Sequence, residues 1–453
     1  MSIRQQLAKI FSHSQPDSKN KEPESSMNIR FRVIVVDFQD NIESASGENT
    51  AKILQSMPDF DVYFYDEPFN KSFLDLESRT LFDLIDKGQD LIEKNNADIL
   101  VWGRRDEDKI RINFQTSTQY QNDDHNFVSL LDSLYLPAEL FSSPNNFPSA
   151  IKTLLHGAII SALNPVDAGL KIHRKYLLKK DIALLSNDNS AKQLAIRYIP
   201  FIMNFLGIIY LSCTYDSENP SDTKITQNLF ETAIKHQDLI DSPLHLGCIY
   251  NHLGQLNECA QEHLNKHQSR YFKEAINNYH QAQRYLGKYT YPYDYGIISY
   301  HLSHLFFKYW KIKEDIQALR DAVSQLREAE KIFSIAQFPE FWANIQGELG
   351  YFLSILGNIT KSVDICLLAI NCYHNQQKIL TEKRNPLVWA STQEHIGQLH
   401  YKIGTEHNSR DNLEDALECF HDALYIYENM TQSDKIKQLL IAINKTNGEL
   451  KGI

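Results

Sequence analysis

The chain has 453 residues, a formal net charge of −11 at pH 7, 42% hydrophobic residues and 23% charged residues. This is the composition of an ordinary globular protein, and the length predicts two or three domains. The acidic balance argues against nucleic acid as a partner, because nucleic-acid-binding proteins usually present a basic surface to the phosphates. The six cysteines follow no framework spacing, which is typical of reduced, packed thiols and favours a cytoplasmic location.

The first segment, residues 1–27, is predicted to be disordered. Residues 13–26 are rich in Pro, Ser, Lys and Glu and bury too little apolar surface to fold. Residues 1–12 lack the uninterrupted apolar run of a secretory signal. The stretch that comes nearest to a membrane span, residues 199–213, has 15 residues, whereas a span needs about 20. We therefore expect no membrane span and interpret this stretch as a buried helix.

Residues 28–165 are predicted to form an α/β domain. Runs of β-branched and aromatic residues predict strands at 29–38, 60–65, 97–103 and 109–116. The last of these is expected to pair with the strand before it through a turn at 106–108. Helical periodicity predicts helices at 47–57, 80–95 and 146–163. Strands that alternate with helices and end in a hairpin indicate a mixed sheet.

From residue 166 onward the pattern is helical. We interpret residues 166–190, which are rich in Lys, as a helical connector, and residues 191–453 as an all-α solenoid. Its helical hairpins are predicted at residues 191–239, 243–288, 292–337, 339–383 and 386–430. A last helix at 435–450 is expected to cover the open end, as a solenoid requires.

A repeat of 47 residues runs through this helical part, and such a period is typical of stacked helical units. The positions that keep this spacing include Pro292, Pro339 and Pro386, then Ala275, Ala322, Ala369 and Ala416. The prolines are expected in the first turn of helices, where a missing N–H costs nothing. Gly357 and Gly404 are expected to end helices in a left-handed conformation. Gly350 is expected where two helices approach closely, and Trp342 and Trp389 are expected to pack in the core.

The repeat resembles the tetratricopeptide repeat. Leu349-Gly350 and Gly357 are similar to that family's first helix, and Ala322 with Ala329 to its second helix. The unit departs from the family in length, because the standard repeat has about 34 residues. The phrases PEFWANIQGELG (339–350) and PLVWASTQEHIG (386–397) resemble long-repeat bacterial members more closely. In several of those an α/β domain comes first, and the ADILVWG strand (97–103) resembles the N-terminal domain of TolB-like and cyclase-associated proteins.

The resemblance implies protein–protein scaffolding, with a ligand in the concave groove lined by the first helix of each unit. Carried over by position, the groove residues are Tyr300, His304, Phe307 and Lys308, then Asn344, Gly347, Tyr351 and Ser354, and finally Ser391, Glu394, Gln398, Tyr401 and Lys402. Aromatic and amide side chains of this kind suit an extended peptide. Each of these positions could equally be a solvated face.

Other chemistry has weaker support in the sequence. The turn after the first strand has Gly47 but none of the lysine of a phosphate loop, and Asp37 and Asp40 are more ordinary as turn or capping acids. Cys259, His263 and His267 are spaced four apart, with Cys248 and His252 nearby, and could hold zinc; the alternative is a polar helix edge with packed thiols. We expect no cofactor and no catalytic motif.

The sequence therefore favours a non-catalytic scaffold or adaptor that binds a peptide or helix of a protein partner. The alternative is a ligand-regulated sensor or enzyme accessory protein whose α/β domain binds a small anion or nucleotide. Self-association stays open, since an acidic, aromatic-lined array could also bind itself.

Overall fold

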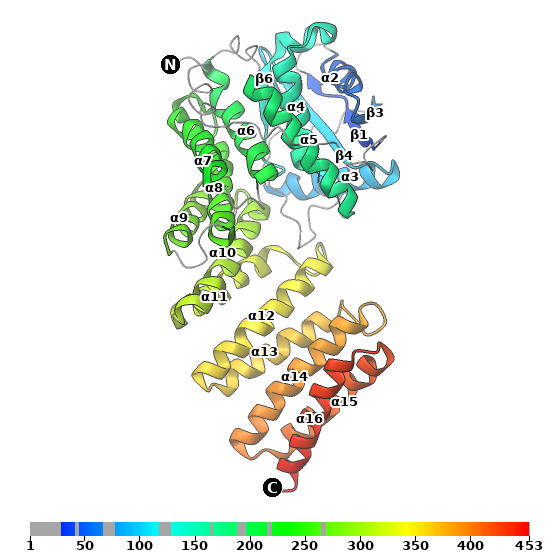
Figure 1. The fold of residues 1–453 in the computed structure, drawn as a ribbon, viewed down its shortest axis with the longest axis vertical. Coiled ribbons are helices and arrows are strands. Elements are labelled where there is room, and N and C mark those ends of the chain that lie inside the picture. Colours follow the sequence, from blue (N-terminus) through cyan, green and yellow to red (C-terminus); the bar gives the residue numbers. More distant parts are fainter. Residues whose placement is uncertain are drawn as a thin grey trace. The chain divides into compact units, whose positions relative to one another are not determined.

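The structure is a computed structural model that describes residues 29–40, 45–66, 78–116, 128–163, 165, 167–187, 196–214, 220–263 and 269–452. A small mixed sheet is followed by a long helical part (Figure 1). The chain divides into two compact units, the first ending at Ile298 and the second beginning at Ser299. The predicted disordered segment, 1–27, lies outside the described residues.

The sheet has the strand order β3-β1-β4-β5-β6. Its strands are β1 (Phe31–Val36), β3 (Phe60–Tyr65), β4 (Ile99–Asp106), β5 (Lys109–Thr116) and β6 (Leu134–Pro137), and the short β2 (Gln39–Asp40) pairs with β4. β1 runs parallel to both β3 and β4, whereas β5 runs antiparallel to both of its neighbours, β4 and β6. The predicted mixed sheet is confirmed. β2 and β6 were not predicted, because two and four residues are too few to show a periodicity.

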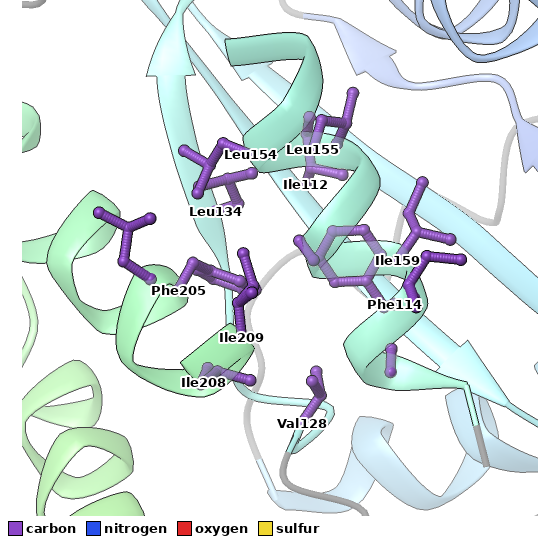
Figure 2. Packing of buried hydrophobic residues seen from close by; sticks show 14 of the residues in the cluster. Ile112, Phe114, Val128, Leu134, Leu154, Leu155, Ile159, Phe205, Ile208 and Ile209 are labelled. Carbon is purple, nitrogen blue, oxygen red and sulfur yellow. The ribbon is translucent and has the colours of Figure 1, made fainter. Parts of the chain in front are cut away.

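Helices cover both faces of this sheet. They are α2 (Ser46–Gln55), α3 (Ser78–Lys94), α4 (Ser149–Ala162) and α5 (Ala168–Asn187). Phe114 of β5 lies in the core beside α4 (Figure 2), whereas the next residue, Gln115, donates from Nε2 to the carbonyl of Ile85 in α3 at 2.8 Å. Because successive residues of a strand point to opposite faces, α3 and α4 lie on opposite sides of β5.

The core of the first unit continues from the sheet into the helical part. Phe205, Ile208 and Ile209 of α6 (Ile199–Thr214) belong to the same cluster as the buried residues of β5 and α4 (Figure 2). Within the described residues, one helical window, Ile196–Cys213, is long and apolar enough to cross a membrane, and 89% of it is buried inside the protein. The interpretation of 199–213 as a buried helix is confirmed.

A buried polar network also joins the sheet to the helices. His252 of α8 (Pro243–His263) has no exposed surface, and its ring nitrogens lie 3.0 Å from Asn204 Oδ1 in α6 and 3.1 Å from Asp132 Oδ2. Asp132 precedes β6, and its backbone carbonyl accepts from Asn113 Nδ2 of β5 at 3.1 Å. The ring of His252 therefore links α8 to both α6 and the segment before β6.

Pairs of antiparallel helices follow one another from α6 to the end of the described chain (Figure 1). The remaining helices are α7 (Pro220–Lys235), α9 (Ser269–Tyr285), α10 (Pro292–Lys313), α11 (Ile316–Ile332), α12 (Pro339–Thr360), α13 (Val363–Gln377), α14 (Pro386–His407), α15 (Arg410–Asn429) and α16 (Ser433–Leu450). Short 3₁₀ turns lie at Ala138–Ser142, Pro144–Asn146, Ile196–Tyr198 and Gln237–Leu239. The predicted hairpins are confirmed as helix pairs, and the predicted last helix is α16. Proline lies in the first turn of α12 and α14, as expected.

A small residue on the first helix meets a large ring on the second in most pairs. The pairings are Gly207 with Phe230, Gly254 with Tyr279, Gly350 with Tyr373, and Gly397 with Phe420. A Cβ on Gly350 would lie 2.7 Å from the Tyr373 ring, closer than real side chains come. The predicted close approach at Gly350 is confirmed, and the same contact extends the repeat back to α6 and α7.

The expected role of Gly357 and Gly404 is wrong. Neither residue ends its helix or has a positive φ; the left-handed residues are Lys361 and Asn408, each with φ of 51°. Gly357 instead lies inside α12, where a Cβ would come within 2.7 Å of Cys366 Sγ on α13. The glycine is needed for close helix packing and not for a turn, because no side chain fits there.

A buried histidine of α4 contacts both α5 and the residue before β3. His156 Nδ1 lies 2.7 Å from Asp181 Oδ2, and its Nε2 lies 3.4 Å from Asp59 Oδ2. Burial by itself lowers the pKa of His156, but hydrogen bonds and charge from the two carboxylates outweigh it and raise this pKa to about 9. The hydrogen bond from His156 lowers the pKa of Asp59, while burial raises the pKa of Asp181.

We predict that Gly350→Ala destabilises the protein by about 1–3 kcal/mol, because the added methyl group collides with the Tyr373 ring. Gly448→Ala is the matched control, since a Cβ there meets nothing within 4 Å, and it should stabilise α16 by up to about 1 kcal/mol. Denaturant unfolding measures both changes. Equal effects of the two substitutions would contradict the packing role of Gly350.

We also predict that the stability of the first unit falls on the order of 3 kcal/mol between pH 6.5 and pH 9 through His156. Its folded pKa lies above its ordinary value, so the contribution is complete below pH 6.5 and is lost as the pH rises through 9. Hydrogen exchange of α4 amides in wild type and His156→Gln gives the measurement. The difference between the two proteins should shrink with pH, whereas the exposed His421→Gln should show no such trend.

Candidate functional site

The candidate site is the row of side chains that α10, α12 and α14 present at the positions predicted to line a groove; we call it the first-helix face. In its α10 part, two side chains contact the carboxylate of Glu348. Tyr300 Oη donates to Glu348 Oε1 at 2.7 Å, and His304 Nε2 lies 3.1 Å from Glu348 Oε2. Glu348 belongs to α12, so these contacts tie two successive pairs together. The sequence did not single out Glu348, although it directly follows the predicted Gly347.

Aromatic rings continue this face from α10 to α12. Phe307 is buried and stacks on Phe352, with ring centroids 4.2 Å apart and planes 15° apart. Tyr351 places its ring edge on Phe307, with centroids 5.6 Å apart, and also lies near His395 of α14. The Tyr351 side chain is nevertheless 40% exposed. It is therefore a large aromatic surface whose position is fixed from both sides.

Side chains of α15 and α16 cover much of the α14 part of the face. Glu394 is only 6% exposed and accepts hydrogen bonds from Tyr427 Oη at 3.1 Å, from Lys435 Nζ at 2.9 Å and from Gln398 Nε2 at 3.3 Å. Burial and the neighbouring Glu394 raise the pKa of Tyr427, which a hydrogen bond with Ser391 lowers in part. Lys435 comes from α16, so this helix packs against α14 at Glu394.

Other predicted groove residues of α14 are less covered than Glu394. Tyr401 is half-buried beneath Lys445 of α16, whose Nζ lies 5.0 Å from the ring centroid. Lys402 Nζ donates to Asn358 Oδ1 at 2.6 Å, and Gln398 is exposed.

The remaining groove positions differ in how open they are. Lys308 and Asn344 are half-buried, and Ser354 donates to the backbone of Tyr351. Gly347 lies against the amide end of the Gln376 side chain. The open part of the face therefore centres on Tyr351 and Gln398, with Tyr300 and His304 beside them.

The glutamine of the repeated phrase has a structural role. Gln346 is fully buried; its Nε2 donates to Glu330 Oε1 at 2.6 Å and its Oε1 accepts from Asn375 Nδ2 at 3.2 Å. One period later, Gln393 Nε2 donates to Asp422 Oδ2 at 3.2 Å. Each glutamine joins the first helix of its pair to the second. Trp389 is half-buried and packs against the C-terminal core cluster.

At the start of the α/β domain, little space remains at the turn around Gly47, for which the sequence gives only weak support as a phosphate site. Gly47 lies in the first turn of α2, and a Cβ there would come within 2.8 Å of Asp37 Oδ1. A protein carboxylate thus already lies at this helix N-terminus, where an anion would otherwise bind. Asp40 is in β2, and its side chain lies outside the described residues.

The residues considered as possible zinc ligands are only partly described. Cys248 and Cys259 both lie on α8, and the ring of His252 between them lies within hydrogen-bond distance of Asp132 and Asn204. The His263 side chain and the whole of His267 lie outside the described residues. Among the described side chains, no group of three His, Cys, Asp or Glu could hold a metal ion. The zinc alternative that includes His263 and His267 thus falls on side chains outside the described residues.

The cysteines are packed in the helical part. No disulfide joins them, all six lying within the described residues, and each is buried except the half-buried Cys419. Burial raises the pKa of Cys213 to about 11 and that of Cys248 well above its ordinary value. Thiols of this kind are poor nucleophiles and pack as small apolar groups.

No protein-family model and no curated protein matches this sequence. Among solved structures, the chain is similar to one titled "Crystal structure of BtubC (BKLC) from P. vanneervenii", with 15% sequence identity and a TM-score of 0.29. The alignment covers 49% of this chain and 89% of that chain. A similarity of this size carries no argument about function.

We predict that Lys435→Ala loosens α16, because it leaves the buried Glu394 carboxylate without its cation. Faster hydrogen exchange of α16 amides would report this change. Lys437→Ala is the matched control on the same helix, since its contact with Asp434 is 3.9 Å long and exposed, and it should leave exchange nearly unchanged. Similar exchange in both variants would exclude Lys435 as the anchor of α16.

Proposed function

We propose that this protein is a non-catalytic, cytoplasmic scaffold of bacterial type, whose helix pairs form a tetratricopeptide-like superhelix. The first-helix face of α10, α12 and α14 binds an extended peptide or a helix of a protein partner. The 47-residue repeat supports the array, and the exposed, buttressed Tyr351 is the observation that carries the binding site.

Tyr351 suits a binding anchor for two reasons. Its ring is held between Phe307 and His395, so little side-chain freedom is lost when a partner covers it. Large aromatic side chains that start partly exposed and become covered contribute most to binding energy at protein interfaces. The ring also lies at the middle of the open part of the face, with Gln398 on the next first helix.

Polar groups beside Tyr351 would fix the direction of a bound peptide. The Glu348 carboxylate is held by Tyr300 and His304, and the Glu348 side chain as a whole is 27% exposed. It could accept hydrogen bonds from backbone N–H groups or a basic side chain, while the Gln398 amide can both donate and accept. An apolar residue against Tyr351, flanked by polar backbone contacts, is the peptide chemistry that this face favours.

The test begins with a photo-crosslinking aromatic residue at position 351, which keeps the shape of Tyr351, in cells that express the full chain. The control carries the same residue at position 368, where Leu368 is 48% exposed on α13, a second helix. A partner should crosslink at 351 and not at 368. The purified partner should then bind Tyr351→Ala at least ~10-fold more weakly than wild type, and Leu368→Ala with unchanged affinity.

Crosslinking that is equal at both positions, or a partner that binds Tyr351→Ala as tightly as wild type, would exclude the first-helix face as the binding site. Circular dichroism spectra should be the same for both alanine variants, because both side chains are exposed.

A further inference from the structure

The outer face of α15 carries a continuous acidic stripe. Asp411, Glu414, Asp415 and Glu418 are exposed and recur at helical spacing opposite the buried side of the helix, and the half-buried Asp422, which accepts from Gln393 of α14, follows them. Arg410 pairs with Glu414 at 2.8 Å, which neutralises one of these charges, and His400 Nδ1 lies 3.7 Å from Asp415 Oδ2. Burial, together with Glu418 and Glu382, raises the pKa of Asp422.

The stripe ends at an apolar hollow. Tyr425 continues the stripe toward the C-terminus of α15 and is 62% exposed. The hollow has a volume of about 610 Å³ and is lined by Tyr425, Ile426, Met430 and Pro386, with Glu382 and Lys383 at the loop before α14. An acidic row beside apolar side chains is the complement of a basic helix that carries apolar residues.

The same chain carries such a helix in its other unit. α5 has Lys171, Arg174, Lys175, Lys179 and Lys180, and its one acid, Asp181, is paired with the buried His156. Arg174 caps α4 by donating to the carbonyls of Ile160 and Ser161. Ile172 and Leu184 are 59% and 50% exposed on α5, and Ile172, Lys175 and Lys179 recur at helical spacing on one face.

We propose that the basic outer face of α5 in one copy of this chain docks on the acidic stripe and apolar hollow of α15 in a second copy. The lysines of residues 171–180 extend over about 14 Å of α5 and the acids of residues 411–422 over about 17 Å of α15, so the two rows can run alongside each other. Ile172 or Leu184 supplies the apolar group that enters the hollow. This surface lies on a second helix of a pair, so the self-association does not depend on the first-helix face or on its partner.

The contact has two further consequences. It joins two different surfaces, so it is head-to-tail and each copy keeps one surface open for the next. A single helix on a helix face with a small hollow gives a small interface, so the association is weak and depends on charge. Salt therefore weakens it, because exposed charges are screened within about 8 Å at physiological ionic strength.

The experiment is sedimentation equilibrium of the full chain up to about 200 µM, at about 50 mM and about 500 mM salt. The average mass should rise above 52.5 kDa with concentration at low salt and return toward it at high salt. Asp411→Lys with Glu418→Lys reverses the stripe, and Lys175→Glu with Lys179→Glu reverses α5. Each double variant should be monomeric alone, and a mixture of the two should associate again, since each retains one native surface.

The matched control is Glu340→Lys with Asp364→Lys, which changes the net charge equally at exposed positions on α12 and α13 and should associate like wild type. Unchanged circular dichroism spectra confirm that the variants fold. A wild-type chain that stays monomeric at low salt would overturn the proposal and leave a basic helix of another protein as the occupant. Association that survives either reversal, or a mixture that stays monomeric, would overturn it too.

Discussion

Helix spacing in this protein depends on a contact between a small residue and a large ring. At Gly350 and Gly397 the absence of a side chain lets Tyr373 and Phe420 lie directly on the backbone of the first helix. The close approach brings the buried Gln346 within hydrogen-bond reach of Asn375 on the second helix. This contact buries one face of each first helix. The adjacent face of α12, which carries Tyr351, remains partly exposed to solvent.

Buried polar contacts have the corresponding role in the first unit. His252 and Asp132 join α8 to the segment before β6, and His156 joins α4 to Asp59 and Asp181. Such contacts are costly to leave unpaired, so they allow few alternative arrangements of the helices on the sheet. The apolar core around Phe114 and Phe205 then runs without interruption from the sheet into the first helix pairs.

The proposed functions use different faces of the same array. Peptide binding would use the first-helix face around Tyr351, and self-association would use the outer face of α15 with α5 of another copy. A head-to-tail assembly would repeat the peptide site along a chain of molecules, and this would raise the local concentration of bound partners. The α14 part of the face contributes less, since α16 covers Glu394 and Tyr401.

The sequence by itself determined the order of the longer strands and the helices and the approximate limits of the helix pairs, because periodicity and the 47-residue spacing are local properties. The strands β2 and β6 were too short to show a periodicity. It could not determine that Gly357 packs against Cys366, that His252 binds Asp132, or that Lys435 covers Glu394, since each contact joins residues from different elements. Glu348 illustrates the same limit: its position in the repeat is unremarkable, and only the approach of α10 gives it Tyr300 and His304 as partners. Tertiary packing thus decided which predicted groove residues remain open, because burial depends on neighbours that are distant in the chain.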